Sequence, residues 1–203
     1  MVRPVRDRLS GRVKLDETCV GGAEEGVIGR LTHNKVLVLV AAQEEGQRIG
    51  RIRLRRVAEL TQATVRECVE EAVERGSVLR TDGLNVYQGL AGYVHEPVVV
   101  KKQAEDASTV LPRVHRVASL LKRWPLGTHH GAVRPEHLND DLDEFAFRFN
   151  RRTSALRGKL FYRLAQQAVQ VEPVPYQALI RHITPVPNTR DRGDLSERNT
   201  HFT

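Results

Sequence analysis

The sequence predicts an α/β domain: a mixed β-sheet flanked by helices, with additional helices toward the C-terminus. Three strand-like runs follow one another within the first 57 residues, and helical and strand-like stretches alternate after them. The 203 residues include 40% hydrophobic and 28% charged side chains, which is ordinary for a globular protein. This length is sufficient for one domain with a substantial buried core.

We predict the first three strands at residues 13–20, 35–42 and 49–57. The second is a nearly continuous apolar run, as expected of a central strand covered on both faces. The link to the third contains Gly46 and is short enough for a hairpin. In the third, arginines alternate with Ile52 and Leu54, so a strand would bury one face and display arginines on the other.

A helix is predicted at residues 61–75, where apolar residues recur at three- and four-residue steps and Gly76 is placed to stop it. The remaining predicted elements are a strand at 77–82, a short helix at 84–90, a strand at 97–101 and helices at about 112–124, 135–152 and 159–170. An antiparallel three-strand meander joined by a crossover helix to further strands is the ribonuclease H-like, or integrase-type, plan. We therefore expect that fold.

The predicted domain organisation has three regions: a basic N-terminal lead at 1–12, the ribonuclease H-like domain at 13–176 and a disordered tail at 177–203. No run approaches the roughly 18 apolar residues of a membrane span. The basic N-terminus has no apolar core, so it is not a secretory signal. Cys19 and Cys68 lack CxxC spacing, which argues against a zinc site or disulfide framework. These features favour a cytoplasmic protein.

The net charge of +7 is concentrated in clusters of basic residues, which favours a nucleic-acid partner. The first cluster includes Arg51, Arg53 and Arg55, and the second includes Arg148, Arg151 and Arg152. Guanidinium groups present a planar fork of donors that suits phosphate. For the first cluster, an edge strand protected from aggregation by its charges is an equally good interpretation.

Two acidic residues and a histidine are the candidate catalytic and metal-binding group. Asp16 lies in the first predicted strand, Asp82 ends a later strand, and His115 opens a helix. Two carboxylates that bracket a pair of Mg²⁺ ions suit phosphoryl transfer, although an imidazole suits Mn²⁺ better than Mg²⁺. Lys122 follows His115 by seven residues, on the same helix face, where it is placed to contact a phosphate beside the scissile one.

Each of these residues also has an ordinary structural interpretation. An aspartate at a strand end, such as Asp82, is usually a turn residue, and a helical histidine, such as His115, is more often structural than a ligand. Glu17 is predicted to point to the face opposite Asp16 and to be a surface charge. Glu144 is the alternative third acidic ligand.

The end of the predicted helix at 112–124 carries further expectations. Pro125 is expected to end or kink it, and Trp124 is expected to pack in the core or at an interface rather than to stack on a base. His129 and His130 flank a turn bounded by glycine; they are either a local ligand pair or turn residues, and we favour the latter.

Several motifs occur in one order along the chain: Leu15-Asp16-Glu17-Thr18-Cys19-Val20-Gly21-Gly22, Thr81-Asp82-Gly83, Val114-His115-Arg116-Val117, Leu121-Lys122-Arg123-Trp124 and Glu144 through Arg152. Over roughly residues 9 to 176 the sequence resembles the catalytic domain of bacterial insertion-sequence transposases, the ISXO2-like group of the DDE superfamily. The resemblance implies DNA cleavage at the ends of a mobile element followed by strand transfer into target DNA. It also implies Mg²⁺ or Mn²⁺ held by Asp16, Asp82 and His115, with a homo-oligomer in the active complex.

The implied partner is DNA at the transposon ends and at the target, in a bacterial cytoplasm and associated with the nucleoid. The residues expected to bind DNA are Lys122, Arg123, Arg148, Arg151, Arg152, Arg51, Arg53 and Arg55. The family normally carries a DNA-binding region ahead of the catalytic domain, so we expect this chain alone to recognise terminal repeats poorly. A metal-dependent nuclease without strand transfer, or an inactive DNA-binding remnant of a transposase, is the alternative.

Overall fold

The structure is a computed structural model that describes residues 7–21, 35–98, 112–128, 135–156, 158–171, 173 and 175–177. The chain divides into one unit of residues 1–171 and another of residues 172–203, and every strand and helix named below belongs to the first. The strands are β1 (Arg12–Gly21), β2 (Lys35–Glu45), β3 (Arg48–Val57), β4 (Val78–Thr81) and β5 (Val94–Pro97). The helices are α1 (Gln62–Ala72), the 3₁₀ helix η1 (Asn85–Tyr87), α3 (Pro112–Thr128), α4 (Leu138–Phe149) and α5 (Lys159–Ala168).

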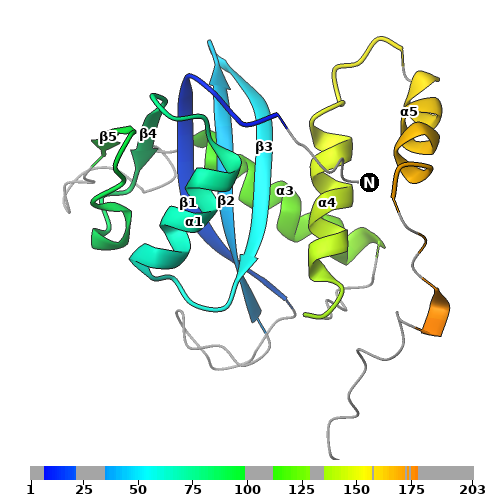
Figure 1. The fold of residues 1–203 in the computed structure, drawn as a ribbon, viewed down its shortest axis with the longest axis horizontal. Helices are drawn as coiled ribbons and strands as arrows, with labels where there is room; N and C mark the ends of the chain where they lie inside the picture. Colours follow the sequence, from blue (N-terminus) through cyan, green and yellow to red (C-terminus); the bar gives the residue numbers. More distant parts are fainter. Residues whose placement is uncertain are drawn as a thin grey trace, which may run out of the picture. The chain divides into compact units, whose positions relative to one another are not determined.

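The five strands form one mixed sheet in the order β3-β2-β1-β4-β5 (Figure 1). The strands β1, β2 and β3 make an antiparallel meander, whereas β4 pairs with both β1 and β5 in parallel. A parallel neighbour requires a crossover connection, and α1 lies in the chain between β3 and β4. The predicted α/β fold, a ribonuclease H-like mixed sheet flanked by helices, is confirmed.

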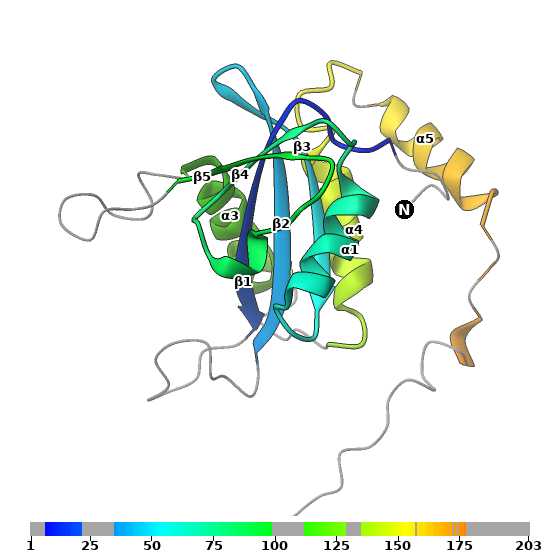
Figure 2. The same cartoon turned by 60° about the vertical axis from the view of Figure 1, so that its left-hand side comes forward.

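Helices cover both faces of the sheet. One cluster of buried side chains lies between the sheet, α1 and η1, and a second lies between the sheet, α3 and α4. In Figure 2, α3 lies behind β1, on the face away from α1. Strand β2 contributes Val38 and Val40 to one cluster and Leu39 and Ala41 to the other. The continuous apolar run therefore marks a central strand, as predicted.

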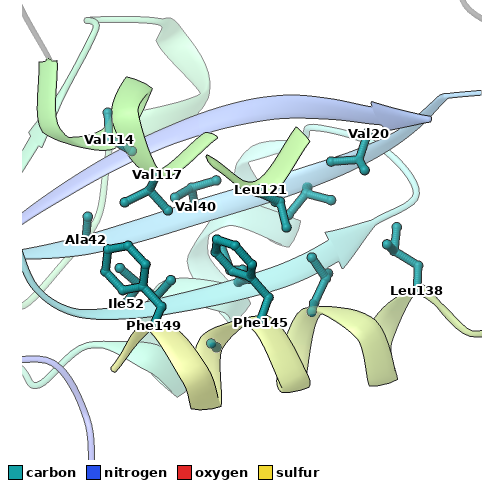
Figure 3. Close-up of a cluster of buried hydrophobic side chains, with 14 residues drawn as sticks. Val20, Val40, Ala42, Ile52, Val114, Val117, Leu121, Leu138, Phe145 and Phe149 are labelled. Carbon is teal, nitrogen blue, oxygen red and sulfur yellow. The ribbon is translucent and has the colours of Figure 1, made fainter. Parts of the chain in front are cut away.

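The cluster under α3 and α4 holds these two helices against the meander. Val117 and Leu121 of α3 and Phe145 and Phe149 of α4 meet over the sheet, above strand residues such as Val40 (Figure 3). The indole ring of Trp124 contacts Phe145 edge to face, with centroids 5.9 Å apart, which confirms the predicted packing role of this tryptophan.

Several predicted boundaries are wrong. The helix predicted at 135–152 is α4, Leu138–Phe149, and the short helix predicted at 84–90 is η1, Asn85–Tyr87. The fifth strand is Val94–Pro97 rather than residues 97–101, and residues 99–101 lie outside the described part of the chain. The apolar residues from Val98 onward suggested a strand, but the pairing with β4 begins at Val94, opposite Val78. The helix α1 ends at Ala72 instead of 75, and Gly76, with a φ of 85°, serves the turn before β4.

Pro125 does not end its helix, because α3 continues to Thr128. A proline inside a helix removes one backbone hydrogen bond, but the Pro125 ring is buried against the core. The hydroxyl of Thr128 donates to the carbonyl oxygen of Trp124, so this turn keeps a side-chain hydrogen bond. His129 and His130 lie outside the described residues.

The N-terminal lead takes part in the fold. Leu9 is fully buried, its N–H donates to the carbonyl oxygen of Ala72 and its own carbonyl accepts from Glu74. Most of the predicted tail at 177–203 lies outside the described residues. Among the helices that the structure describes, none combines the length and the apolarity needed to cross a bilayer.

Candidate active site

The parallel pairing of β1 and β4 sets the position of the two aspartates. The register ends at Lys14 opposite Arg80, and Asp16 and Asp82 each follow two residues later. Because the strands run parallel, residues equally far beyond the last pair lie side by side, so the two carboxylates lie near each other just beyond the end of β4. One carboxylate oxygen each from Asp16, Glu17 and Asp82 lie within 4.8 Å of one another. The structure therefore brings Asp16 and Asp82 together.

Asp82 is held by the turn that follows β4. Its Oδ1 atom accepts a hydrogen bond from the N–H of Leu84 at 3.2 Å, and Gly83 adopts a φ of 83°. The hydroxyl oxygen of Thr81 accepts from the N–H of Gly83 and lies 2.9 Å from Nε2 of His95 on β5. Asp82 is thus a turn residue, and the same turn places it in the acidic cluster.

The helix α3 brings His115 to this cluster. Nδ1 of His115 lies 3.5 Å from Oδ2 of Asp16. Val114 and Val117 on either side of it are buried, and they fix the helix against the sheet. The predicted group of Asp16, Asp82 and His115 is therefore centred on Asp16, which contacts His115 and shares the cluster with Asp82.

A buried ion-pair network beneath the site was not predicted from the sequence. Glu44 of β2 lies 3.1 Å from Nζ of Lys14 on β1 and 2.8 Å from a guanidinium nitrogen of Arg113 on α3. Arg113 is two residues from His115, so the network ties the start of α3 to the sheet. A lysine inside a strand of otherwise buried residues was the available signal, because a buried ammonium requires a partner.

The electrostatics of the cluster suit a divalent cation. Burial raises the pKa of Asp16 to about 6, the negative charges of Glu17 and Asp82 also raise it, and His115 opposes the shift. Only 8% of Asp16 is exposed, so water screens this repulsion poorly. Close carboxylate oxygens are the ligands that Mg²⁺ and Mn²⁺ prefer, and a bound cation would remove the repulsion. The donor set therefore fits the metal that the sequence predicted.

The prediction that Glu17 is a surface charge is wrong. Its side chain is partly buried, and its Oε2 atom accepts a hydrogen bond of 2.7 Å from the hydroxyl of fully buried Tyr87. Burial, followed by the neighbouring charge of Glu17, raises the pKa of the Tyr87 hydroxyl, which keeps the proton on the donor. The expected alternation holds, because β1 stays paired with β2 through Gly21: Glu17 contacts Tyr87 on the α1 side of the sheet, and Asp16 contacts His115 of α3. Their carboxylate oxygens nonetheless lie within 4.8 Å of each other, past the end of the pairing between β1 and β4.

The predicted DNA-binding residues have different surroundings. Lys122 and Arg123 are exposed on α3, the helix that carries His115. Arg55, in contrast, pairs with Glu67 and Glu71 of α1, while Arg51 and Arg53 bond to Asp7 and to backbone oxygens of the N-terminal lead. Because β3 is the edge of the sheet, the structure favours the interpretation of the first cluster as edge protection.

The second basic cluster mainly contacts the protein itself. Arg152 stacks over Phe149 and donates to the carbonyl oxygens of Ile49 and Gly50, and Arg151 stacks over Phe147. Arg148 pairs with Glu144 on the same helix. Glu144, the alternative third ligand, is not among the described residues that form the acidic cluster.

Comparison with known proteins agrees with this architecture. No curated protein shows significant similarity to the chain. The sequence matches the family described as the ISXO2-like transposase domain over residues 8–150, which is more than half of the chain and includes the whole sheet, Asp16, Asp82, His115 and Lys122. The chain belongs to the ISXO2-like transposase domain family.

Proposed function

We propose that this protein is the catalytic domain of a transposase that cleaves DNA at the ends of a mobile element and joins the ends to target DNA, using Mg²⁺ or Mn²⁺. Membership of the family supports a function in transposition. The observation that carries the finer proposal is the convergence of Asp16, Asp82 and His115 at the end of β4. Divalent ions bound there would activate water or a 3′-hydroxyl and stabilise the leaving oxygen.

Each residue has a distinct role in this proposal. Asp16 and Asp82 supply the carboxylate oxygens that hold the cations, and Asp16 must lose its proton to do so. His115 lies beside Asp16 and serves as the third ligand or as a hydrogen-bond partner that orients the Asp16 carboxylate. Lys122, two turns along the same helix, contacts the phosphate next to the scissile one.

The helix α3 is the element best suited to lie along the DNA backbone. Its 17 residues include four basic residues and no acidic one. Arg116, Lys122 and Arg123 are all exposed. A helix that is basic on its exposed side and carries His115 near its start would place phosphate contacts and the acidic cluster on one DNA strand.

The test is a cleavage and joining assay with DNA taken from either side of the protein's own gene. With Mn²⁺ or Mg²⁺, the wild-type protein should nick this DNA and should join a pre-cut end with a free 3′-hydroxyl to a target duplex. Asp82→Asn should do neither, because it removes a metal ligand that the turn holds in place.

The other outcomes separate the competing functions. Cutting without joining would identify a metal-dependent nuclease, and DNA binding without either reaction would identify an inactive remnant. Equal cutting by wild type and Asp82→Asn would show that the acidic cluster is not the catalytic site.

A further inference from the structure

Glu17 belongs to the acidic cluster by geometry, although a residue next to Asp16 in a strand should face away from it. One of its carboxylate oxygens lies within 4.8 Å of ligand atoms from both Asp16 and Asp82. The backbone N–H of Glu17 donates to Oδ1 of Asp16 at 2.9 Å, so the two residues are also linked locally. Carboxylate oxygens of three residues thus lie close together, past the end of the pairing between β1 and β4.

A buried tyrosine holds Glu17 in this position. Tyr87 is fully buried in the cluster under α1, and its only hydroxyl proton goes to Oε2 of Glu17 at 2.7 Å. Tyr87 ends η1, which packs against α1, and the side chain of Gln62 donates to the carbonyl oxygen of Asn85 in the same short helix. The donor is therefore fixed by the core, and the hydrogen bond to a charged acceptor is strong.

A carboxylate that accepts this bond retains the capacity to bind a cation. Its two oxygens offer about four lone-pair directions, and the hydroxyl of Tyr87 uses one of them. Hydrogen bonds from the protein to metal-binding carboxylates are common, because they orient the ligand and reduce its freedom before the metal binds.

We propose that Glu17 is a further carboxylate ligand of the divalent-cation site, and that Tyr87 is the positioning residue that aims it. This inference rests on the proposed metal-dependent function of the same cluster. It assigns both residues to the site, whereas their neighbours Thr18 and Val86 would have no part in it.

The experiment measures Mn²⁺ binding to the full chain by calorimetry, with thermal unfolding in EDTA as the check on folding. Glu17→Gln should weaken Mn²⁺ binding by tenfold or more, and Tyr87→Phe, which keeps the buried ring, should weaken it by about tenfold. In the Glu17→Gln background, Tyr87→Phe should produce no further loss, because Tyr87 acts through Glu17. Glu59→Gln, which removes an exposed carboxylate between β3 and α1, should bind Mn²⁺ as the wild type does.

The outcomes distinguish this inference from the function on which it rests. If Asp16→Asn and Asp82→Asn lose Mn²⁺ binding while Glu17→Gln keeps wild-type affinity, Glu17 is not a ligand and the metal-dependent function stands. If the wild-type protein binds no Mn²⁺, the metal-dependent function and this inference both fail. If Tyr87→Phe weakens binding equally with and without Glu17, Tyr87 does not act through Glu17.

Discussion

Asp16 is the residue at which folding and function oppose each other. Its carboxyl is buried, its two acidic neighbours repel a second charge, and its pKa is raised to about 6. At neutral pH the folded protein must carry this charge in a poorly hydrated place, whereas the unfolded chain exposes it to water. A residue selected for stability alone would not be an aspartate here.

Asp16→Asn should therefore stabilise the metal-free protein at neutral pH. Because the folded pKa lies above the unfolded value, the destabilising effect of Asp16 is absent below about pH 4 and grows as the pH rises to about 6. From about pH 4 to pH 7.5, the free energy of unfolding of the variant should rise relative to wild type by at most roughly 3 kcal/mol. Urea unfolding in EDTA at both pH values measures this. If the free energy of unfolding differs between variant and wild type by the same amount at both pH values, the prediction is contradicted.

Asp16 and Asp82 could be identified from the sequence as candidate site residues, whereas the position of Glu17 beside them could not. Asp16 lies in β1 and Asp82 directly follows β4, and a motif marks each position, so local pattern and resemblance agreed. Glu17 was misassigned as a surface charge because alternation gives the face of the sheet on which a side chain lies, but not what covers that face; here Tyr87, on the α1 side, donates to its carboxylate. The position of Tyr87 against β1 depends on tertiary packing, which no local pattern in residues 13–20 can predict.

At the scale of elements, the site depends on how firmly α3 is fixed to the sheet. Glu44 links Lys14 of β1 and Arg113 of α3, and the Lys14 side chain is only 5% exposed. Glu44→Gln would leave a buried ammonium without its counter-charge, so we expect a loss of about 3 kcal/mol in the free energy of unfolding. Glu70→Gln, which removes the partner of the exposed Arg75, should cost less than about 1 kcal/mol. Urea unfolding measures both variants. Equal losses in their free energies of unfolding would contradict the idea that the buried ion pair contributes more than the exposed one.

A second element contact protects the edge of the sheet. The side chain of Asn150, after α4, accepts from the N–H of Ile52 at 2.7 Å and donates to its carbonyl oxygen at 3.1 Å. Asn150→Ala should lower the free energy of unfolding by about 2 kcal/mol, because the N–H and the carbonyl oxygen of Ile52 both lose their partner. Asn139→Ala, at an exposed position of α4, should change the free energy of unfolding by less than about 0.5 kcal/mol. Chemical denaturation measures both, and equal effects would contradict a specific role for Asn150.

The elements were predicted better than their ends and their contacts. The meander, the crossover helix and the apolar run of β2 are all visible in the sequence, and the strand order of the sheet agrees with them. The start of β5 was misplaced because its register is set by pairing with β4. The arginines after α4 suggested DNA binding, but only the fold shows that Arg152 reaches the carbonyl oxygens of β3.

At the scale of the whole molecule, the net charge of +7 predicts DNA binding without saying which surface binds. The basic residues of α3 and those of β3 differ in their surroundings. Lys122 and Arg123 are exposed on a helix without acidic residues, whereas Arg55 pairs with two glutamates across α1. Phosphate contacts should therefore come from α3 rather than from β3.

This difference predicts a specific change in salt dependence. The logarithm of the binding constant for a nonspecific duplex should fall linearly with the logarithm of the salt concentration. Each phosphate contact removed should reduce the magnitude of this slope by about one. The double variant Lys122→Gln, Arg123→Gln should lower it by about two, at unchanged stability, because both side chains are exposed. Arg55→Gln carries one charge fewer but should leave the slope near the wild-type value, because Arg55 is held by Glu67 and Glu71. Fluorescence anisotropy over a salt series measures all three proteins. A larger change in slope for Arg55→Gln than for the α3 variant would place the DNA on β3, away from the helix that carries His115.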